Sequence, residues 1–304
     1  MASAATIAAA AIGGPAAAAA PAQAPEPTAV DVTKRPAEVR EYWTAKRMRE
    51  AIPLGPLAEI EGEARTAKRG GSSAKPVARV NRKPRRAHGK VFFRLGGTNY
   101  VCSGTSADAP TGRLVWTAGH CVYEPNGLLD PVGYATNWQF VPAYKSGREP
   151  FGEWPATRLA ATPQWRRSGC AANCGDYRFD LGAAIVARNG ANRTLKEVVG
   201  ARRLGFNAPR SQTYRAFGYP ATGSFDGTRM YRCRSPLTGS DYSSSPQTMR
   251  ISCDMTAGAS GGGWVANGKL LSVISYGYAT EEGSLYGPYQ GSAAKGFYSS
   301  VKNG

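Results

Sequence analysis

Short apolar or alternating runs, separated by glycine-rich turns, characterise residues 90–304. Such runs, rich in β-branched and aromatic residues, are typical of strands. The sequence predicts strands over residues 90–95, 99–104, 113–117, 138–143, 158–161, 181–187, 215–220, 249–253, 263–266 and 269–276. In this part of the chain a helix is predicted only at the end, over residues 292–302. Because no regular helices separate the strands, the pattern favours an all-β fold over a parallel βαβ fold.

The first third of the chain has a different pattern. Ala and Pro dominate residues 2–37, which offer little apolar surface to bury in a core. Residues 38–52 predict an amphipathic helix, with Val39 and Trp43 on its apolar stripe and Pro53 stopping it. Two interpretations remain open: the helix docks on the following domain, or it is an isolated segment in a disordered linker.

The N-terminus has features of an export signal. Residues 4–20 are mildly apolar, and residues 22–24 (Ala-Gln-Ala) have the small-x-small form of a cleavage site. No Lys or Arg precedes the apolar run, so a low-complexity linker is the alternative. We predict a signal peptide over residues 1–24 and secretion to the extracellular space. No later run of about 18 apolar residues indicates a membrane-spanning helix.

A pro-segment is predicted between the signal and the strand-rich region, over residues 25–86. Residues 70–74 are rich in Gly and Ser and predict a flexible stretch, and residues 79–86 are rich in Lys and Arg. An exposed basic run in a flexible segment suits processing by proteolysis. The mature start is therefore expected between about residues 75 and 90.

The net charge of +17 admits two interpretations. A strongly basic protein can bind acidic polymers such as cell-wall anions or nucleic acid. The simpler interpretation is a cationic, soluble surface, because the arginines are dispersed and no nucleic-acid motif accompanies them. We therefore expect no nucleic-acid partner.

The six cysteines begin at Cys102, and in an exported glycine-rich chain they predict disulfides. Six cysteines allow about 15 pairings, among which sequence alone does not choose. The alternative is a zinc site that combines Cys170 and Cys174 with another pair. No Cys-x2-Cys pair is present, so we expect no metal and no cofactor.

Two motifs carry candidate chemistry. Residues 117–121 (Thr-Ala-Gly-His-Cys) place one of only two histidines beside a cysteine, and residues 256–263 place Ser260 within a run of glycines. Nucleophilic serine catalysis needs a rigidly held base and a hydroxyl around which backbone N–H groups can gather. His120 and Ser260 are therefore the candidate base and nucleophile.

These motifs resemble the histidine and serine motifs of the trypsin/chymotrypsin-type serine peptidases. The resemblance covers roughly residues 90–304 and implies an aspartate between the two motifs. Asp180, directly followed by an apolar run, fits better than Asp176, and the chain order His, Asp, Ser is the chymotrypsin-type order.

The resemblance implies a fold of two antiparallel six-stranded β-barrels with a short C-terminal helix, preceded by the signal and pro-segment. We place the first barrel at residues 87–195 and the second at 196–304. In this interpretation the first barrel supplies His120 and Asp180, the second supplies Ser260, and the site lies in the groove between them.

The resemblance also implies roles for individual residues. His120 is the general base, Asp180 orients it, Ser260 forms the acyl-enzyme, and the N–H groups of Gly258 and Ser260 form the oxyanion hole. It further selects a disulfide between Cys102 and Cys121. The close spacing of Cys170 and Cys174 suggests a local pair, which leaves Cys233 with Cys253.

Three departures from the family pattern bear on activation. Ala259 stands where most trypsin-like enzymes carry the Asp that pairs with the new N-terminus, so release of an inhibitory pro-segment is the better hypothesis. Gly263 replaces the usual Pro. The 60-residue separation of His120 and Asp180 implies an enlarged loop around residues 126–174.

Asp254 lies six residues before Ser260, the offset at which trypsin holds a carboxylate that binds Arg or Lys. This predicts a weak preference for Arg or Lys at P1. Glutamate specificity is disfavoured because no histidine follows His120. Ser275 and Gly277 resemble the edge positions that pair with the substrate backbone.

The sequence thus predicts a secreted serine endopeptidase, made as a zymogen and acting as a monomer without a membrane anchor. Its expected partners are polypeptide substrates and its own pro-segment as an inhibitor. The alternative is a catalytically silent family member that binds proteins or anionic polymers.

Overall fold

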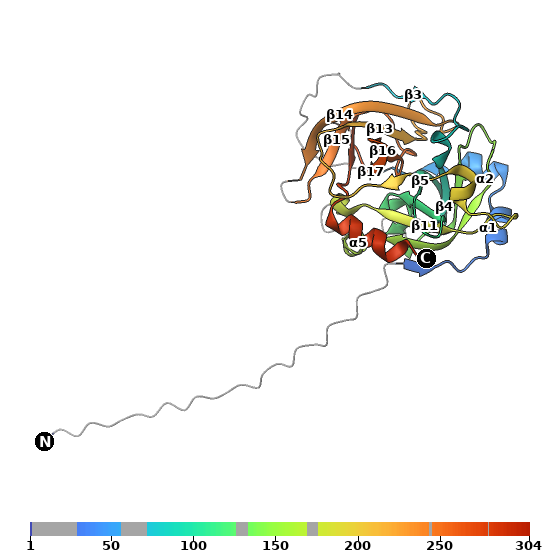
Figure 1. The fold of residues 1–304 in the computed structure, drawn as a ribbon, viewed down its shortest axis with the longest axis horizontal. Helices are drawn as coiled ribbons and strands as arrows, with labels where there is room; N and C mark the ends of the chain where they lie inside the picture. The colour runs from blue at the N-terminus through green and yellow to red at the C-terminus, as the bar shows by residue number, and fades with distance from the viewer. Residues whose placement is uncertain (2–28, 56–71, 126–132, 169–175, 243–244, 279) are drawn as a thin grey trace.

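The computed structural model describes residues 1, 29–55, 72–125, 133–168, 176–242, 245–278 and 280–304. Two mainly antiparallel β-structures lie side by side, and the helices are few and short (Figure 1). The predicted signal peptide, apart from Met1, and the predicted Cys170–Cys174 pair lie outside the described residues.

The first sheet closes into a six-stranded barrel. Its strands pair in the order β10-β11-β6-β5-β4-β9, and β9 pairs again with β10. Three tryptophans of these strands, Trp116, Trp138 and Trp154, are each almost fully buried. The strands are β4 (His88–Leu95), β5 (Thr98–Ala107), β6 (Leu114–Thr117), β9 (Thr136–Pro142), β10 (Trp154–Ala161) and β11 (Gly182–Val186).

The second sheet follows the order β12-β17-β16-β13-β14-β15-β18. An isolated bridge between Tyr276 and Tyr286 links β18 to the chain just after β17. The strands are β12 (Arg203–Leu204), β13 (Thr213–Gly218), β14 (Tyr231–Asp241), β15 (Thr248–Ser252), β16 (Gly263–Ala266), β17 (Lys269–Val273) and β18 (Ser284–Gly287).

The C-terminal helix α5 (Ser292–Val301) packs against the first barrel, although it follows the second sheet in the chain. The ring of Phe297 lies 5.3 Å from that of Trp116. Just before α5, the buried amide of Gln290 accepts from the Trp116 indole at 2.8 Å and donates to the carbonyls of Gly205 and Leu270. This one side chain therefore links a strand of the first barrel to the second sheet and the chain beside it.

Short elements connect the strands. They are the strand pair β7 (Tyr123–Glu124) and β8 (Gly133–Tyr134), the helices α3 (Pro163–Arg167) and α4 (Leu195–Val199), and three 3-10 turns, η1 (Arg85–Ala87), η2 (Gly119–Cys121) and η3 (Tyr177–Phe179). Two of the 3-10 turns, η2 and η3, position site residues.

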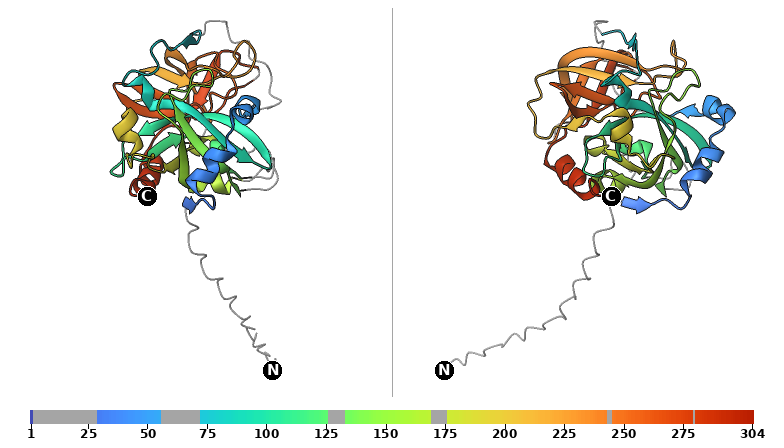
Figure 2. Two further views of the ribbon diagram at one scale, coloured as in Figure 1. Left: turned by 90° about the vertical axis from the view of Figure 1, so that its right-hand side faces the viewer. Right: turned by 45° about the vertical axis from the view of Figure 1, so that its right-hand side comes forward.

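Residues 29–55 form what we call the clasp, a segment that runs along the outside of the first barrel (Figure 2). It contains β1 (Ala29–Asp31), α1 (Pro36–Tyr42), α2 (Ala45–Glu50) and β2 (Ile52–Pro53). Strand β1 pairs antiparallel with β10, and β2 pairs parallel with β5. The segment is therefore docked, which decides between the two interpretations of its apolar stripe.

The single helix predicted over residues 38–52 is two short helices instead. The Thr44 side chain accepts a hydrogen bond from the Arg47 N–H and begins α2, so the chain turns at Trp43. This turn buries Trp43, whose indole donates to the Asn137 carbonyl at 2.5 Å. Helix α2 ends at Glu50, before Pro53 is reached.

Residues 72–86 belong to the second sheet and its surroundings. Strand β3 (Lys75–Pro76) pairs with β14, and the Val77 N–H donates to the Met230 carbonyl at 2.9 Å. The basic side chains of residues 79–85 are exposed, as predicted, but η1 and the Arg86 contact with the Val199 carbonyl hold the backbone. In the described part of the chain, no helix is long and apolar enough to cross a membrane.

Candidate active site

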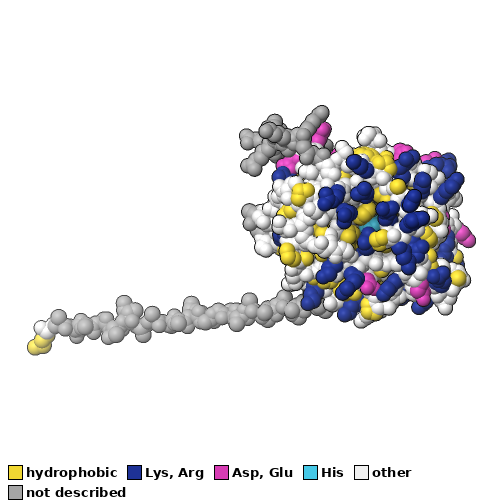
Figure 3. Space-filling view, turned by 45° about the horizontal axis from the view of Figure 1, so that its top comes forward, with side chains coloured by type: hydrophobic (Ala, Val, Ile, Leu, Met, Phe, Trp, Pro, Cys, Tyr) yellow, Lys and Arg dark blue, Asp and Glu magenta, His cyan; other side chains and the backbone are white. Residues whose placement is uncertain are grey.

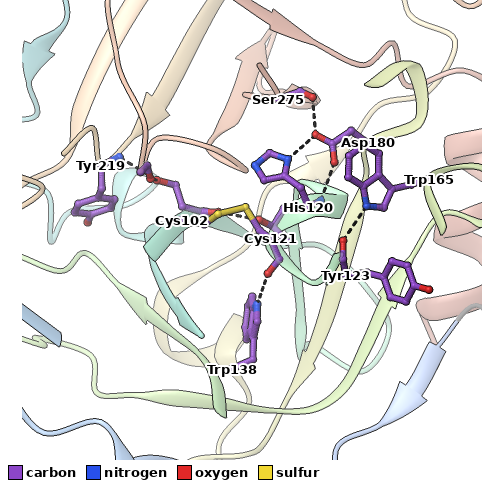
Figure 4. The surroundings of a disulfide bond; sticks show 12 residues. Cys102, His120, Cys121, Tyr123, Trp138, Trp165, Asp180, Tyr219 and Ser275 are labelled. Carbon is purple, nitrogen blue, oxygen red and sulfur yellow. Dashed lines mark hydrogen bonds and ion pairs between the residues drawn. A yellow bond between two sulfur atoms is a disulfide. The ribbon is translucent and has the colours of Figure 1, made fainter. Parts of the chain in front are cut away.

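His120 lies in η2, directly after strand β6 of the barrel. The following residue, Cys121, is joined to Cys102 of β5, so the disulfide ties the turn to the neighbouring strand. His120 is 7% exposed, and its Nδ1 lies 2.8 Å from the carboxylate of Asp180 (Figure 4). Strand, turn and disulfide together hold the ring in one place.

Asp180 is fully buried at the junction of η3 and β11. Besides the His120 ring, its carboxylate accepts the His120 backbone N–H at 2.9 Å and the Ser275 hydroxyl at 2.5 Å. Three donors therefore hold this carboxylate in one orientation. The rival Asp176 instead caps η3 and forms an ion pair with Arg178 at 2.7 Å.

This arrangement fixes the tautomer of the imidazole. With Nδ1–H donating to the carboxylate, the neutral ring leaves its Nε2 lone pair as an acceptor. Nε2 is buried and has no hydrogen-bond partner among the described residues. The ring therefore presents an unengaged base, which such sites often retain until a substrate tightens the geometry.

Ser260 precedes β16 in the second sheet and is 3% exposed. Its carbonyl accepts the Ser103 N–H at 2.7 Å, and Ser103 follows the disulfide residue Cys102. Gly261, the residue after Ser260, has φ +78°, and a Cβ there would lie 2.0 Å from the Thr117 hydroxyl. Only glycine permits this approach, which brings the serine loop against the residues that lead into His120.

A second connection joins the serine loop to Asp180. The Gly261 N–H donates to the Ile274 carbonyl at 2.7 Å, and the Ile274 N–H donates to the Gly262 carbonyl at 2.8 Å. The next residue, Ser275, is the one whose hydroxyl bonds to Asp180. Residues 260, 180 and 120, distant in the sequence, thus belong to one hydrogen-bonded neighbourhood.

Gly258 has φ +91°, a conformation that side chains resist. Its N–H, predicted to be an oxyanion donor, here donates to the Leu54 carbonyl of the clasp at 3.1 Å. The neighbouring Ala259 is fully buried in an apolar cluster of the second sheet.

Asp254, predicted to bind a basic P1 side chain, has an exposed side chain rather than a buried one. One of its oxygens accepts the Ala74 N–H at 2.6 Å. Gly277 lies next to β18, where a Cβ would be 3.1 Å from the Ser284 carbonyl. The Ser275 N–H donates to the Tyr286 carbonyl, so its backbone and side chain both have structural partners.

Aromatic residues that sequence reasoning did not single out surround the triad candidates. The Trp165 ring lies 6.2 Å from the His120 ring, and the Tyr177 ring lies 4.7 Å from that of Tyr276. Burial, together with the charge of Asp180, raises the pKa of Tyr177, so its phenol is neutral. In the sequence, Tyr177 stands three residues before Asp180. This spacing is the signal that could have predicted its place beside the site.

Disulfides join Cys102 to Cys121 and Cys233 to Cys253. These are two of the three pairs predicted in the sequence analysis, and the third, Cys170–Cys174, lies outside the described residues. Cys102, His120 and Cys121 have potential metal-ligand atoms within 4.8 Å of one another. Because both sulfurs are in the disulfide, neither is a thiolate that could bind zinc.

The comparisons come from solved structures. Protease Anisep from Arthrobacter nicotinovorans is 38% identical, with a TM-score of 0.65, and the match covers 77% of this chain and 100% of that one. The thermostable serine protease AL20 from an extremophilic microorganism is 35% identical, with a TM-score of 0.64 and coverage of 72% and 97%. A Glu endopeptidase, 20% identical with a TM-score of 0.59 over 77% and 99% of the two chains, shares the fold. No family model and no curated protein matches the chain.

A closed antiparallel barrel, a second sheet beside it and a carboxylate–imidazole pair near a glycine-flanked serine define a serine hydrolase. With a relative 38% identical over its full length, the chain belongs to the trypsin/chymotrypsin-type serine peptidase family. It is a serine protease.

Proposed function

We propose that this protein is a secreted serine endopeptidase in which His120, Asp180 and Ser260 form the catalytic triad. The 2.8 Å contact between His120 Nδ1 and the buried Asp180 carboxylate carries the proposal. A buried carboxylate that orients an imidazole with a free Nε2 has no evident purpose in a binding module. Catalysis uses both features.

In the proposed acylation step, Ser260 Oγ attacks the carbonyl carbon of the scissile peptide bond. His120 Nε2 takes the hydroxyl proton, and Asp180 stabilises the imidazolium that forms. The tetrahedral intermediate collapses when the C–N bond breaks, and His120 gives its proton to the leaving amine. Water then attacks the acyl-enzyme by the same route and releases the acid and the free serine.

The negative charge on the carbonyl oxygen needs donors that are already in place. In this proposal the N–H groups of Gly258 and Ser260 are the donors that bind the oxyanion. The φ of +91° at Gly258 gives the loop a turn at this position that an extended backbone would not have. A donor of this kind contributes about a hundredfold to a thousandfold in rate. The same N–H bonds to Leu54 in the intact chain, which is consistent with synthesis as a zymogen.

The pro-segment, residues 25–86 in the sequence prediction, is the proposed inhibitor. Contacts of residues 72–76 with the second sheet favour a cut before residue 72 over one near residue 86. Anisep, matched over its full length, leaves almost a quarter of this chain outside the match. The export signal at 1–24 and the barrel boundaries 87–195 and 196–304 remain part of the proposal.

For substrates, we propose polypeptides with a weak preference for Arg or Lys at P1, set by Asp254. An exposed carboxylate attracts a cation less strongly than a buried one, so the preference should be modest. A library of peptides that differ only at P1 tests this, with Asp254→Asn as the matched variant. Equal cleavage after Arg, Glu and Leu by the wild type would refute the preference.

Labelling with a fluorophosphonate probe tests whether Ser260 is a reactive nucleophile. The processed protein should be labelled at Ser260, whereas the Ser260→Ala and His120→Ala variants should resist labelling. Absence of label from the processed wild type would favour the alternative, a silent protein- or polymer-binding member. The many Lys and Arg side chains on one face make an anionic polymer the first ligand to test in that case (Figure 3).

A further inference from the structure

The clasp ends on the proposed oxyanion donor. Strand β2 pairs parallel with β5, with Ile52 opposite Tyr100 and Pro53 opposite Val101. The Leu54 N–H then donates to the Val101 carbonyl at 3.0 Å, and its carbonyl accepts the Gly258 N–H at 3.1 Å. Leu54 thus bridges a strand of the first barrel and the serine loop of the second sheet.

Beside this hydrogen bond, the end of the clasp and the serine loop are also in close van der Waals contact. A Cβ on Gly55 would lie 2.8 Å from the Cβ of Ala257, so the clasp backbone touches the loop beside Gly258. One N–H group can serve one strong acceptor at a time. A substrate carbonyl that needs the Gly258 N–H must therefore displace Leu54.

The rest of the clasp is anchored away from the site. Val39, Trp43 and Met48 are each at most 4% exposed and belong to the same buried hydrophobic cluster as side chains of the first barrel. The Tyr42 hydroxyl donates to the Asn99 side chain at 2.6 Å. These contacts lie N-terminal to Leu54, and a cut made after residue 55 breaks none of them.

We propose that the clasp inhibits the peptidase by occupying the Gly258 N–H with the Leu54 carbonyl, and that cleavage between residues 56 and 71 alone does not activate the enzyme. The inference rests on the proposed function. Cleavage converts an intramolecular contact into a bimolecular one, so the clasp remains bound at high protein concentration and leaves on dilution. Activation is the departure of the clasp, and the surface along β5 and Gly258 is its binding site.

The test uses the full chain with a recognition sequence for an unrelated site-specific peptidase placed within residues 56–71. The protein is cut completely, and the rate of fluorophosphonate labelling at Ser260 is measured at micromolar and at low nanomolar concentration. The concentrated cut protein should label as slowly as the intact chain. Dilution should raise the rate by about a hundredfold or more, the effect of one oxyanion donor.

Two matched variants of the uncut chain test the contact itself. Leu54→Pro removes the N–H that bonds to Val101 and should raise the labelling rate, whereas Leu54→Ala keeps both backbone groups and should stay latent. In the cut protein, Trp43→Ala should release the clasp at a higher concentration than the wild type. Ile52→Ala, which changes an exposed side chain, should not.

Three results would overturn the inference. Fast labelling of the concentrated cut protein would mean that the covalent link alone caused latency, and fast labelling of the intact chain would mean that the clasp does not inhibit; both leave the peptidase proposal standing. Absence of labelling from every form, including the dilute cut protein and Leu54→Pro, would instead refute the peptidase proposal and this inference with it.

Discussion

The hydroxyl of Ser275 donates a 2.5 Å hydrogen bond to the carboxylate of Asp180. Ser275 comes from the end of the second sheet, and Asp180 comes from the first barrel. The carboxylate that holds the imidazole is therefore itself held across the boundary between the two halves. This contact predicts that Ser275 positions Asp180, a role different from the substrate-edge role expected from the sequence.

Ser275→Ala should lower kcat by about tenfold to a hundredfold with little change in KM, because a hydrogen bond to a charged group contributes about 1.5–3 kcal/mol. Steady-state kinetics on the clasp-free enzyme measure this. Ser300→Ala removes a hydroxyl that bonds only locally within α5, so its kinetics should equal those of the wild type. An equal effect of both changes would argue against the positioning role.

Asp180→Asn should lower kcat by about ten-thousandfold, since the amide cannot stabilise the imidazolium or enforce the same tautomer. Asp176→Asn provides the control, because Asp176 caps η3 and pairs with Arg178 without reaching the imidazole. Its kcat should change little, because neither the η3 cap nor the ion pair with Arg178 touches the imidazole. A large loss in Asp176→Asn with a small loss in Asp180→Asn would reverse the assignment.

Gly261→Ala should destabilise the fold more than Gly268→Ala does. Both glycines have similar positive φ, +78° and +75°, so both substitutions carry a left-handed strain of about 1–2 kcal/mol. At Gly261 the added Cβ also meets the Thr117 hydroxyl and the Ser103 carbonyl, whereas at Gly268 it meets nothing within 4 Å. Denaturant unfolding in a Ser260→Ala background, which prevents self-digestion, measures the difference, and equal losses would contradict it.

Loss of either of the two described disulfides should lower the unfolding free energy by a similar amount, but the two losses should differ in their effect on kcat. Their cysteines are 19 and 20 residues apart, so replacing either pair by Ala should cost about 3 kcal/mol of unfolding free energy. Loss of Cys102–Cys121 should also lower kcat, because this bond ties the His120 turn to β5. Loss of Cys233–Cys253 should affect kcat less. The reverse order of kcat losses would show that the disulfide does not position His120.

The contribution of Glu149 to stability should fall as the pH rises from about 5 to 7. Burial, with a smaller contribution from the charge of Glu153, raises the pKa of Glu149 from 4.5 to about 7. Between these values the folded state keeps a proton that the unfolded state releases, so deprotonation favours unfolding as the pH rises. Glu149→Gln should flatten this part of the profile of Tm against pH, and an unchanged profile would exclude Glu149 as its source.

Sequence patterning predicted strands well where apolar runs are short and bounded by turns, as for β4 and β11 in the barrel and β16 in the second sheet. It missed β14, the longest strand, because its sequence mixes arginine, glycine and serine without clear alternation. Pairing with β13, β15 and β3 stabilises that strand. Strands β1, β2 and β3 were missed for the same reason, since each depends on a partner strand distant in the chain.

The sequence by itself determined which residues are the candidate base and nucleophile, because the residue types and glycines at 117–121 and 256–263 can be read locally. It also determined that the chain would form strands and that the segment before them was distinct. Tertiary structure alone decided that Ser275 bonds to Asp180, that Asp254 is exposed, and that the Leu54 carbonyl reaches Gly258. Each of these depends on where separate elements cross in space, and local propensity carries no information about such crossings.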